Sequence, residues 1–490
     1  LYDKHIKQIL FFNSFNPYLL TRFYSVILSF PYFSVNQNRA YLVFSFHTMD
    51  KNAEGIFMKK ASPFIHGTLV LTAANLFSRF IGFYNRIFLA GLIGAHQMGI
   101  YQMIFPIYLV GFSLCFQGFQ TALSNMTASL RAKGLEGDAK KILSVTVCFT
   151  VMLSILFAAV IFIFAEAICQ TFFHEDDCIP CLRIAVFALP FVGIKSCIHG
   201  YSLGAGTSSL PALSLCIEQI SRVASIFLIS VTFYAELPAG AILAVLGMVI
   251  GEFVSFVFTI LSFYFRQKDS VSSIYTRQSL FHQLLSLGMP LTGNALSVTL
   301  LQSVESILIP LMLTRFYGNQ HTAIETYGIL NGMALPFILF PSTMTNSLSV
   351  MLLPKISAAK ADGSEKTLRR ASRYPVIFCL LLGLLGFFGF FTLGPWIGRL
   401  VFQSGECGTY LRLLSFLCPF LYISGTLSSI LNGLGETKTT FLHNGLSLTL
   451  RIFFILFAVP RQGIYGYLFG LTAGSILQVL LNFRHLKQVL

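Results

Sequence analysis

Two arginines in one apolar stretch are the residues of this sequence whose type and spacing point most directly to chemistry. Arg79 and Arg86 are seven residues apart, which is two turns of an α-helix, so they share one face with Asn75, one turn earlier. No acidic residue lies between 65 and 91 to neutralise them. Because guanidinium groups bind phosphate with paired donors, we interpret these three residues as a candidate anion site. The alternative is that the two charges extend toward a polar boundary.

Further ionisable residues interrupt other apolar stretches, where each costs about 3 kcal/mol or more if the stretch crosses a membrane. Glu218 and Arg222 are spaced i,i+4, so they can neutralise each other on one helix, and a purely structural role is an equal alternative for them. Glu305 belongs to a stripe of polar residues. The candidate binding residues are Asn75, Arg79, Arg86, Glu218, Arg222, Glu305 and Arg451.

Two other embedded charges have simpler interpretations. Glu252 follows Gly251 in a helix of small residues, where close helix packing explains the sequence. Lys195 lies in Gly193-Ile-Lys-Ser196, which lacks the remainder of a phosphate-binding loop.

Motifs for catalysis and metal binding are weak throughout. Cys178-Ile-Pro-Cys181 with nearby His174 offers three ligands on one loop, a set that rarely makes a metal or redox site. No Ser/His/Asp constellation and no nucleotide-binding loop is present in the sequence. We therefore expect a protein that is not an enzyme, with no catalytic residue, no metal and no cofactor.

Composition places these charges in a membrane. The chain has 490 residues, of which 55% are hydrophobic and only 11% charged, with a mean hydropathy of +0.74. Since a soluble protein carries about 25% charged residues, this composition indicates a polytopic membrane protein. The net charge of +14 would suit nucleic acid, but the basic residues lie mainly in short gaps between apolar stretches, which is typical of membrane topology instead.

Twelve apolar segments after Met58 are long enough to cross the hydrocarbon core, which needs about 20 residues. They lie near 65–91, 98–127, 142–168, 182–203, 210–233, 238–264, 283–313, 326–352, 374–398, 409–431, 439–459 and 464–483. The sequence therefore predicts an all-α fold with an N-terminal six-helix lobe (58–264), a cytoplasmic loop (265–282) and a C-terminal six-helix lobe (283–490).

An internal repeat supports this division. Arg131-Ala-Lys-Gly134 matches Lys360-Ala-Asp-Gly363, and Gly204-Ala-Gly206 matches Gly433-Leu-Gly435. Both matches have the same separation along the chain, which we call the repeat offset, and the same offset relates Arg222 to Arg451. Six helices per half predict lobes related by a pseudo-twofold axis along the membrane normal, with the binding site between them.

The loops predict orientation. With Met58 inside, eighteen Lys and Arg residues lie at both ends and in the gaps after even-numbered spans, against five on the opposite side. That opposite side also carries the acidic run His174-Glu-Asp-Asp177. Basic residues are retained in the cytoplasm, so we expect both termini there.

Residues 1–57 do not fit this pattern. The stretch has no clean apolar span, and its nearest approach to a secretory signal, Tyr24–Val35, is short and contains Pro31. We interpret 1–57 as an upstream extension that is not part of the native chain. The alternative is a disordered or interfacial amphipathic tail.

Four stretches resemble a known family. His66–Gly94, Gly99–Tyr108, Tyr327–Pro336 and Leu352–Ser357 are similar to the stage V sporulation protein B group. That group belongs to the multidrug/oligosaccharidyl-lipid/polysaccharide flippase superfamily. The resemblance covers about 58–490, and in it Arg79 and Arg86 match the family's cavity arginines.

The resemblance implies a two-lobed, V-shaped fold that alternates between inward and outward openings in the bacterial cell membrane. It implies a flippase for a polyprenyl-diphosphate-linked saccharide, such as a peptidoglycan or polysaccharide precursor. The expected partners are this anionic lipid-linked saccharide and membrane lipids, without nucleic acid. One alternative is a cation-coupled multidrug exporter of the same fold, which an excess of embedded cations over acids disfavours. Another is a non-transporting scaffold in spore or envelope assembly.

Overall fold

The computed structural model describes residues 63–232, 240–266, 274–361 and 365–489. The predicted extension 1–57 lies outside these residues. The chain divides into two units, residues 1–63 and 64–490, and the helical bundle belongs to the second.

All regular elements of the described chain are helices. The first half comprises α4 (Pro63–Phe112), η1 (Ser113–Gln117), α5 (Gly118–Ala132), α6 (Glu136–Ile168), η2 (Cys169–Phe173), α7 (Cys178–Val186), α8 (Ala188–Gly204), α9 (Ser209–Thr232) and α10 (Gly240–Arg266). The second half begins with α11 (Arg277–Tyr317), α12 (Gln320–Tyr327), η3 (Gly328–Ala334), α13 (Leu335–Leu339) and α14 (Ser342–Ala361). It continues with α15 (Glu365–Val401), α16 (Gly405–Leu414), η4 (Ser415–Leu417), α17 (Cys418–Gly433), α18 (Thr437–Phe457), α19 (Val459–Gln462) and α20 (Ile464–Val489).

The predicted fold class is confirmed. Within the described ranges, 10 helical segments are long and apolar enough to cross a membrane. The first of them, Leu71–Ala132, contains most of the first predicted span and all of the second, and the two are separated at Gly94, where φ is 77° and the helix breaks. The eighth predicted span, 326–352, is divided between the end of α12, η3, α13 and the start of α14.

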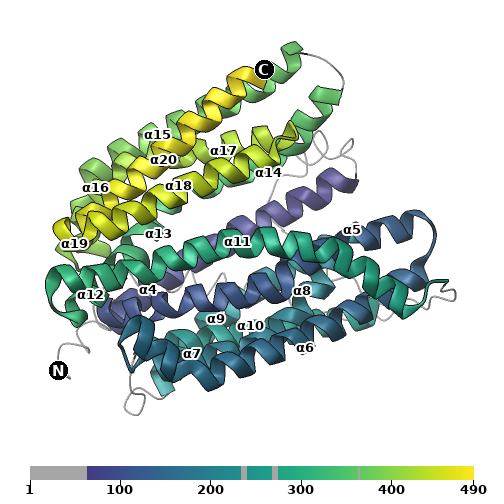
Figure 1. The fold of residues 1–490 in the computed structure, drawn as a ribbon, viewed down its shortest axis with the longest axis horizontal. Coiled ribbons are helices and arrows are strands. Elements are labelled where there is room, and N and C mark those ends of the chain that lie inside the picture. The colour runs from purple at the N-terminus through teal and green to yellow at the C-terminus, as the bar shows by residue number, and fades with distance from the viewer. Residues whose placement is uncertain (1–62, 233–239, 267–273, 362–364, 490) are drawn as a thin grey trace, which may run out of the picture. The chain divides into compact units, whose positions relative to one another are not determined.

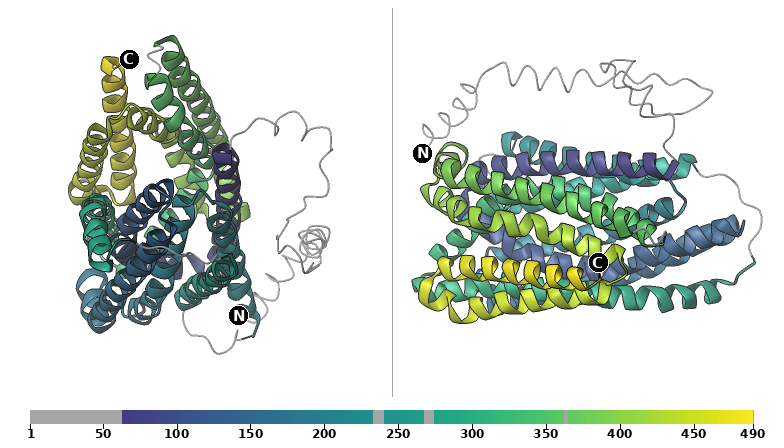
Figure 2. Two further views of the ribbon diagram at one scale, coloured as in Figure 1. Left: turned by 90° about the vertical axis from the view of Figure 1, so that its right-hand side faces the viewer. Right: turned by 90° about the horizontal axis from the view of Figure 1, so that it is seen from above.

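The long helix α11 lies between the other helices of the two halves (Figure 1). Helices α15–α20 lie on one side of it and α5–α10 on the other, and the long helices run in a broadly common direction (Figure 2). Near its start, Leu280 and Leu284 pack in an apolar cluster with Phe119 of α5, whereas Ile309 and Leu313 belong to the largest core cluster. The helix therefore joins the packing of one half to that of the other.

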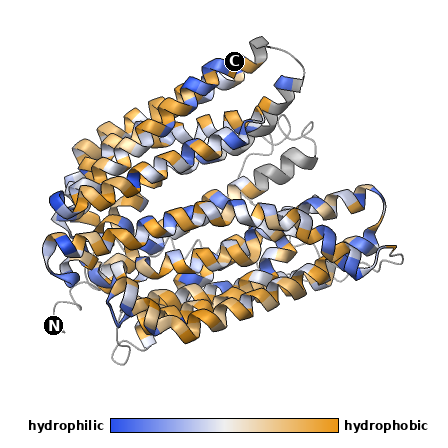
Figure 3. Ribbon diagram, viewed as in Figure 1, coloured by the Kyte–Doolittle hydropathy of each residue, from blue (hydrophilic) through white to orange (hydrophobic). Residues whose placement is uncertain are grey.

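Hydrophobic residues predominate along the helices of the bundle (Figure 3), and many of them face outward. The most hydropathic windows of α6 and α15 are only 11% buried, and they expose large side chains such as Ile163 and Leu385. Such faces are stable in lipid, because a helix satisfies its own backbone groups there. The chain is thus a multi-pass membrane protein.

The internal repeat corresponds to one interaction made twice. In the first half Arg131 Nη1 donates to the carbonyl of Ala205 at 3.3 Å, and in the second half Lys360 Nζ donates to that of Leu434 at 2.6 Å. Each accepting carbonyl stands in a tight turn whose last glycine has a positive φ, 77° at Gly206 and 86° at Gly435. The repeated basic residue therefore ties the end of one helix to the turn between two others.

A buried hydrogen bond between a threonine and a cysteine occurs at equivalent positions of both halves, with the two residue types exchanged. Thr150 Oγ1 lies 3.2 Å from Cys197 Sγ, and at the equivalent positions of the second half Cys379 Sγ lies 3.1 Å from Thr426 Oγ1. The repeat offset found in two short motifs therefore extends to the packing of the helices.

The two halves meet closely where 95–99 packs against 324–328, and we call this contact the glycine crossing. A Cβ at Gly99 would lie 2.2 Å from the carbonyl oxygen of Ile324, and one at Gly328 would lie 2.0 Å from that of Ala95. The repeat offset relates Gly99 to Gly328 and also Ala95 to Ile324. The contact is therefore reciprocal, as expected beside a twofold axis, and only glycine allows such close backbone approach.

Polar contacts between the halves surround the glycine crossing. The rings of His96 and His321 stack with centroids 4.0 Å apart. Gln320 Nε2 donates to the carbonyl of Phe173 at 3.1 Å and to Glu175 Oε2 at 3.0 Å. These contacts close this end of the space between the halves.

We predict that Gly328→Ala weakens the closed end. The added methyl group would meet backbone atoms that cannot rotate away, and overpacking of this kind costs about 1–3 kcal/mol. The melting temperature of the purified protein should fall by several degrees. Gly293→Ala is the matched control, because a Cβ there meets nothing within 4 Å. Equal melting temperatures for the two variants would show that the crossing does not hold the halves together.

Candidate functional site

A cavity of about 770 Å³ lies inside the described helices, next to the glycine crossing. Met98 and Tyr327, which neighbour the two crossing glycines, line the cavity at this end. Its walls come from both halves, chiefly α4 on one side and α11, α13 and α20 on the other, with further residues from α9, η3 and α18. The volume is within the usual range for a ligand site, about 300–1,000 Å³.

Five of the seven predicted binding residues line this cavity. They are Arg79, Arg86, Arg222, Glu305 and Arg451. Glu218 is buried behind Arg222. Asn75 is exposed and lies outside the lining, which on this helix begins at Ser78. The periodicity of α4 therefore identified a face of the helix, but the cavity extends along only part of that face.

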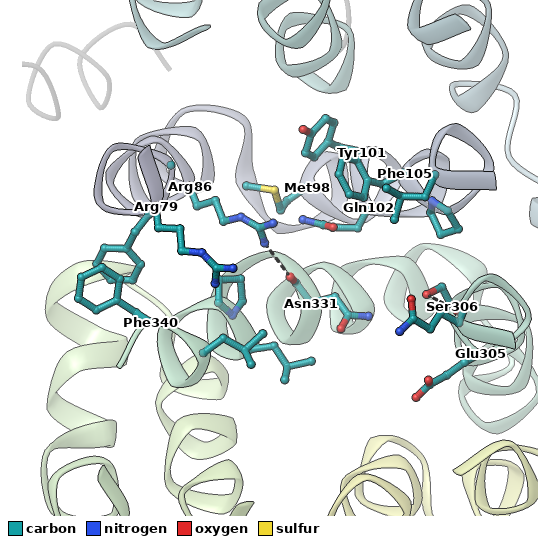
Figure 4. A pocket seen from close by; sticks show the side chains of 18 of the residues that line it. Arg79, Arg86, Met98, Tyr101, Gln102, Phe105, Glu305, Ser306, Asn331 and Phe340 are labelled. Atoms are coloured by element: carbon teal, nitrogen blue, oxygen red, sulfur yellow. Dashed lines mark hydrogen bonds between the residues drawn. The ribbon is translucent and has the colours of Figure 1, made fainter. Parts of the chain in front are cut away.

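Arg79 and Arg86 enter the cavity without acidic partners among the described residues (Figure 4). Arg86 is half-buried, and its Nη1 lies 3.5 Å from the backbone carbonyl oxygen of Asn331 in the other half. Arg79 is exposed to the cavity beside Phe340. Their charges are thus available to a ligand.

Arg222 is held differently, within a buried cluster of two cations and two acids. Its Nη2 lies 2.9 Å from Glu218 Oε1, which confirms the predicted i,i+4 pair, and 3.8 Å from Glu252 Oε1. Lys195 Nζ donates to Glu218 Oε2 at 2.8 Å and also to Glu252 Oε2. The cluster is formally neutral, so Arg222 reaches the cavity with its charge already balanced.

The sequence analysis did not predict that Lys195 and Glu252 belong to this cluster. Close packing explains part of their position, because a Cβ at Gly251 would lie 2.9 Å from the carbonyl oxygen of Glu218. That approach of α10 to α9 lets Glu252 reach Arg222. The sequence did offer one indication of this cluster. The three consecutive spans 182–203, 210–233 and 238–264 together contain two embedded acids and two embedded cations, so their charges can cancel.

Arg451, in the second half, is also paired with a carboxylate. Its Nη2 donates to Glu305 Oε1 at 2.5 Å, and the hydroxyl of Tyr467 donates to the same oxygen at 3.1 Å. Arg451 thus occupies the repeat position of Arg222 and, like it, is neutralised by a carboxylate. Sequence reasoning selected Glu305 and Arg451 separately but not Tyr467, because no spacing along the chain links these three helices.

The cysteine motif at 178–181 begins α7. Cys178 and Cys181 are fully buried and unpaired, and they pack in the apolar core. Within the described residues no group of three potential ligands is close enough to hold a metal ion.

Comparison with protein families identifies the chain. Residues 64–360, more than half of it, match the family model described as "Polysaccharide biosynthesis protein". The chain belongs to the polysaccharide biosynthesis protein family. Residues 295–457 of this family member also match the MatE model. The predicted resemblance is confirmed.

Individual relatives agree with the family. This polysaccharide biosynthesis protein is 26% identical over 438 residues to "Stage V sporulation protein B" of Bacillus subtilis (strain 168), covering 87% of this chain and 84% of the relative. Among solved structures, it is similar to "Lipid II flippase MurJ, inward closed conformation", with a TM-score of 0.67, 18% identity and coverage of 86% and 87%. An inward-facing multidrug resistance MATE family transporter has a TM-score of 0.66 at 13% identity, covering 86% of this chain and 98% of the transporter. These two structures establish the transporter fold.

We predict that Lys195→Met strongly destabilises the protein. The change leaves Glu218 and Glu252 close together with only Arg222 to balance them, and breaking a buried ion pair in this way costs about 3–5 kcal/mol. The double variant Lys195→Met/Glu252→Gln should recover most of the loss in melting temperature, because it removes the unpaired acid.

Lys133→Met, at an exposed position, is the control for the loss of a lysine. If Lys195→Met melts like the wild type, the four residues do not form a mutually neutralising cluster.

Proposed function

We propose that this family member is a flippase that moves a polyprenyl-diphosphate-linked saccharide across the bacterial cytoplasmic membrane by alternating access. The observation that carries the proposal is the pair Arg79 and Arg86, which enters a cavity between the halves without acidic partners in the described chain. The negative charges of a diphosphate would neutralise these two arginines. In surroundings of low dielectric constant, charge-assisted hydrogen bonds to it are strong and can be paired.

The names of the relatives support a lipid-linked cargo. One is a flippase for lipid II, and another is a sporulation protein of Bacillus subtilis. We infer that the cargo of this chain belongs to the same chemical class.

The main alternative is a cation-coupled drug exporter, which the MatE match and the MATE structure favour. Among the described residues, four arginines but only one carboxylate, Glu305, line the cavity, and that carboxylate already pairs with Arg451. A cationic drug would therefore be repelled. A non-transporting scaffold is the second alternative, and it leaves the cost of two uncompensated arginines in the membrane without a purpose.

We predict a graded loss of transport for substitutions at Arg79 and at Arg86. Arg→Lys keeps the charge but loses the planar fork, so it should reduce flipping moderately. Arg→Ala should reduce flipping severely while the protein still inserts, since removing a charge from a membrane helix lowers the insertion cost. Arg→Glu should be the most severe, because it repels a diphosphate. The measurement is the transfer of lipid-linked saccharide between leaflets of vesicles that contain the purified protein.

Arg315→Ala is the matched control, because Arg315 is exposed at the end of α11 and lies outside the cavity lining. Equal transport by all these variants at equal protein levels would remove the two arginines from the site. Transport of drug cations, with none of the lipid-linked saccharide, would favour the exporter.

We also propose that both termini lie in the cytoplasm, so that the glycine crossing closes the outer side. A cysteine at Glu136 should then react only with reagents supplied from the cytoplasm, and one at Asp176 only with reagents from outside, because both positions are exposed. Native Cys178 is unsuitable as a reporter because it is fully buried. Labelling of position 136 from outside would reverse the orientation.

A further inference from the structure

Amide side chains are concentrated in the cavity beside the arginines. Six amides of the described chain line it: Asn85, Gln102, Gln219, Gln302, Asn331 and Gln478. An amide without hydrogen bonds is costly away from water, at about 1–3 kcal/mol for each unsatisfied group. Amides gathered around one space inside a membrane protein are therefore expected to hydrogen-bond a ligand there.

Two of these amides lack partners for one of their polar atoms. Gln102 Nε2 and Asn85 Oδ1 are buried and make no hydrogen bond within the described residues. Gln302, in contrast, is exposed on the part of α11 that lines the cavity. Unused donors and acceptors are thus present together in one space.

The position of Gln102 and Asn331 adds an independent observation. They come from opposite halves, are related by the repeat offset, and follow the crossing glycines Gly99 and Gly328 by three residues each. The repeat thus places an amide from each half next to the pseudo-twofold axis. In the view of Figure 4, these two amides lie between Arg79 and Arg86 on one side and Ser306 and Glu305 on the other.

Charge differs between these two parts of the cavity. Arg79 and Arg86 have no acidic partner in the described chain, whereas Arg451 is neutralised by Glu305. Within the described part of the chain, a negative group placed beyond the amides would meet Glu305 and no uncompensated cation. That part of the cavity therefore suits an uncharged ligand.

We propose that Gln102, Gln302 and Asn331 form a subsite for a neutral, hydroxyl-rich saccharide next to the diphosphate site. An amide offers both donor and acceptor, and each sugar hydroxyl also donates and accepts, so the two groups match. The proposal rests on the proposed function, because the diphosphate bound by the arginines delivers the sugar to the amides. It further specifies that a sugar with a carboxylate is a poor cargo.

Binding of three probes to the purified full-length chain tests the proposal. The probes are a polyprenyl diphosphate without sugar, the same lipid with one N-acetylhexosamine, and the same lipid with one hexuronic acid. Two or three hydrogen bonds of ordinary strength should make the N-acetylhexosamine probe bind about tenfold more tightly than the sugar-free probe. The hexuronic acid probe should gain nothing.

Substitution of the amides tests whether they cause the tighter binding of the N-acetylhexosamine probe. Gln102→Met, Gln302→Met and Asn331→Leu should each reduce the tenfold gain to about threefold or less, since each removes one hydrogen bond of about 0.5–1.5 kcal/mol. Their affinity for the sugar-free probe should not change. Gln170→Met is the matched control, because Gln170 is exposed on η2 and lies outside the cavity lining. Melting temperatures of the variants confirm that they fold.

The subsite is overturned if the sugar-free and N-acetylhexosamine probes bind equally, if all three variants keep the gain, or if the hexuronic acid probe binds best. A failure of the proposed function gives a different result. In that case the sugar-free probe does not bind, or binds equally to the Arg79→Ala and Arg86→Ala variants.

Discussion

The glycine crossing is the contact on which the rest of the structure depends. Gly99 and Gly328 bring two helical segments from opposite halves so close that each backbone would collide with a Cβ on the other. Because the contact is reciprocal, it keeps the halves aligned about one pseudo-twofold axis. The contact closes one end of the cavity, and it places pairs of residues from the repeat, such as Gln102 and Asn331, on facing walls.

Charge in the cavity is of two kinds. Arg222 and Arg451, at equivalent repeat positions, are balanced by carboxylates from neighbouring helices, so their charges hold helices together within each half. Arg79 and Arg86 have no such balance in the described residues. In a membrane an unbalanced charge is costly. We therefore infer that Arg222 and Arg451 are structural and that Arg79 and Arg86 bind an anionic ligand.

The sequence predicted the helices and the repeat because both follow from patterns along the chain. Apolar stretches located the spans, and the constant repeat offset located equivalent turns. Contacts between helices were predicted less well. Glu252 reaches Arg222 because Gly251 lets α10 approach α9, and Asn75 lies on the predicted face of α4 but beyond the cavity. Such outcomes depend on helix separation and on depth in the bundle, which periodicity along one helix does not contain.

The central claim is that Arg79 and Arg86 select a diphosphate. Native mass spectrometry of the full chain can measure this directly by competition between a polyprenyl diphosphate, monophosphate and alcohol of equal length. Two uncompensated guanidinium groups should favour the diphosphate over the monophosphate by about tenfold or more, since hydrogen bonds to charged groups contribute roughly 1.5–3 kcal/mol each. The preference should vanish in the Arg79→Gln/Arg86→Gln variant. Equal binding of the three lipids by the wild-type protein would contradict the claim.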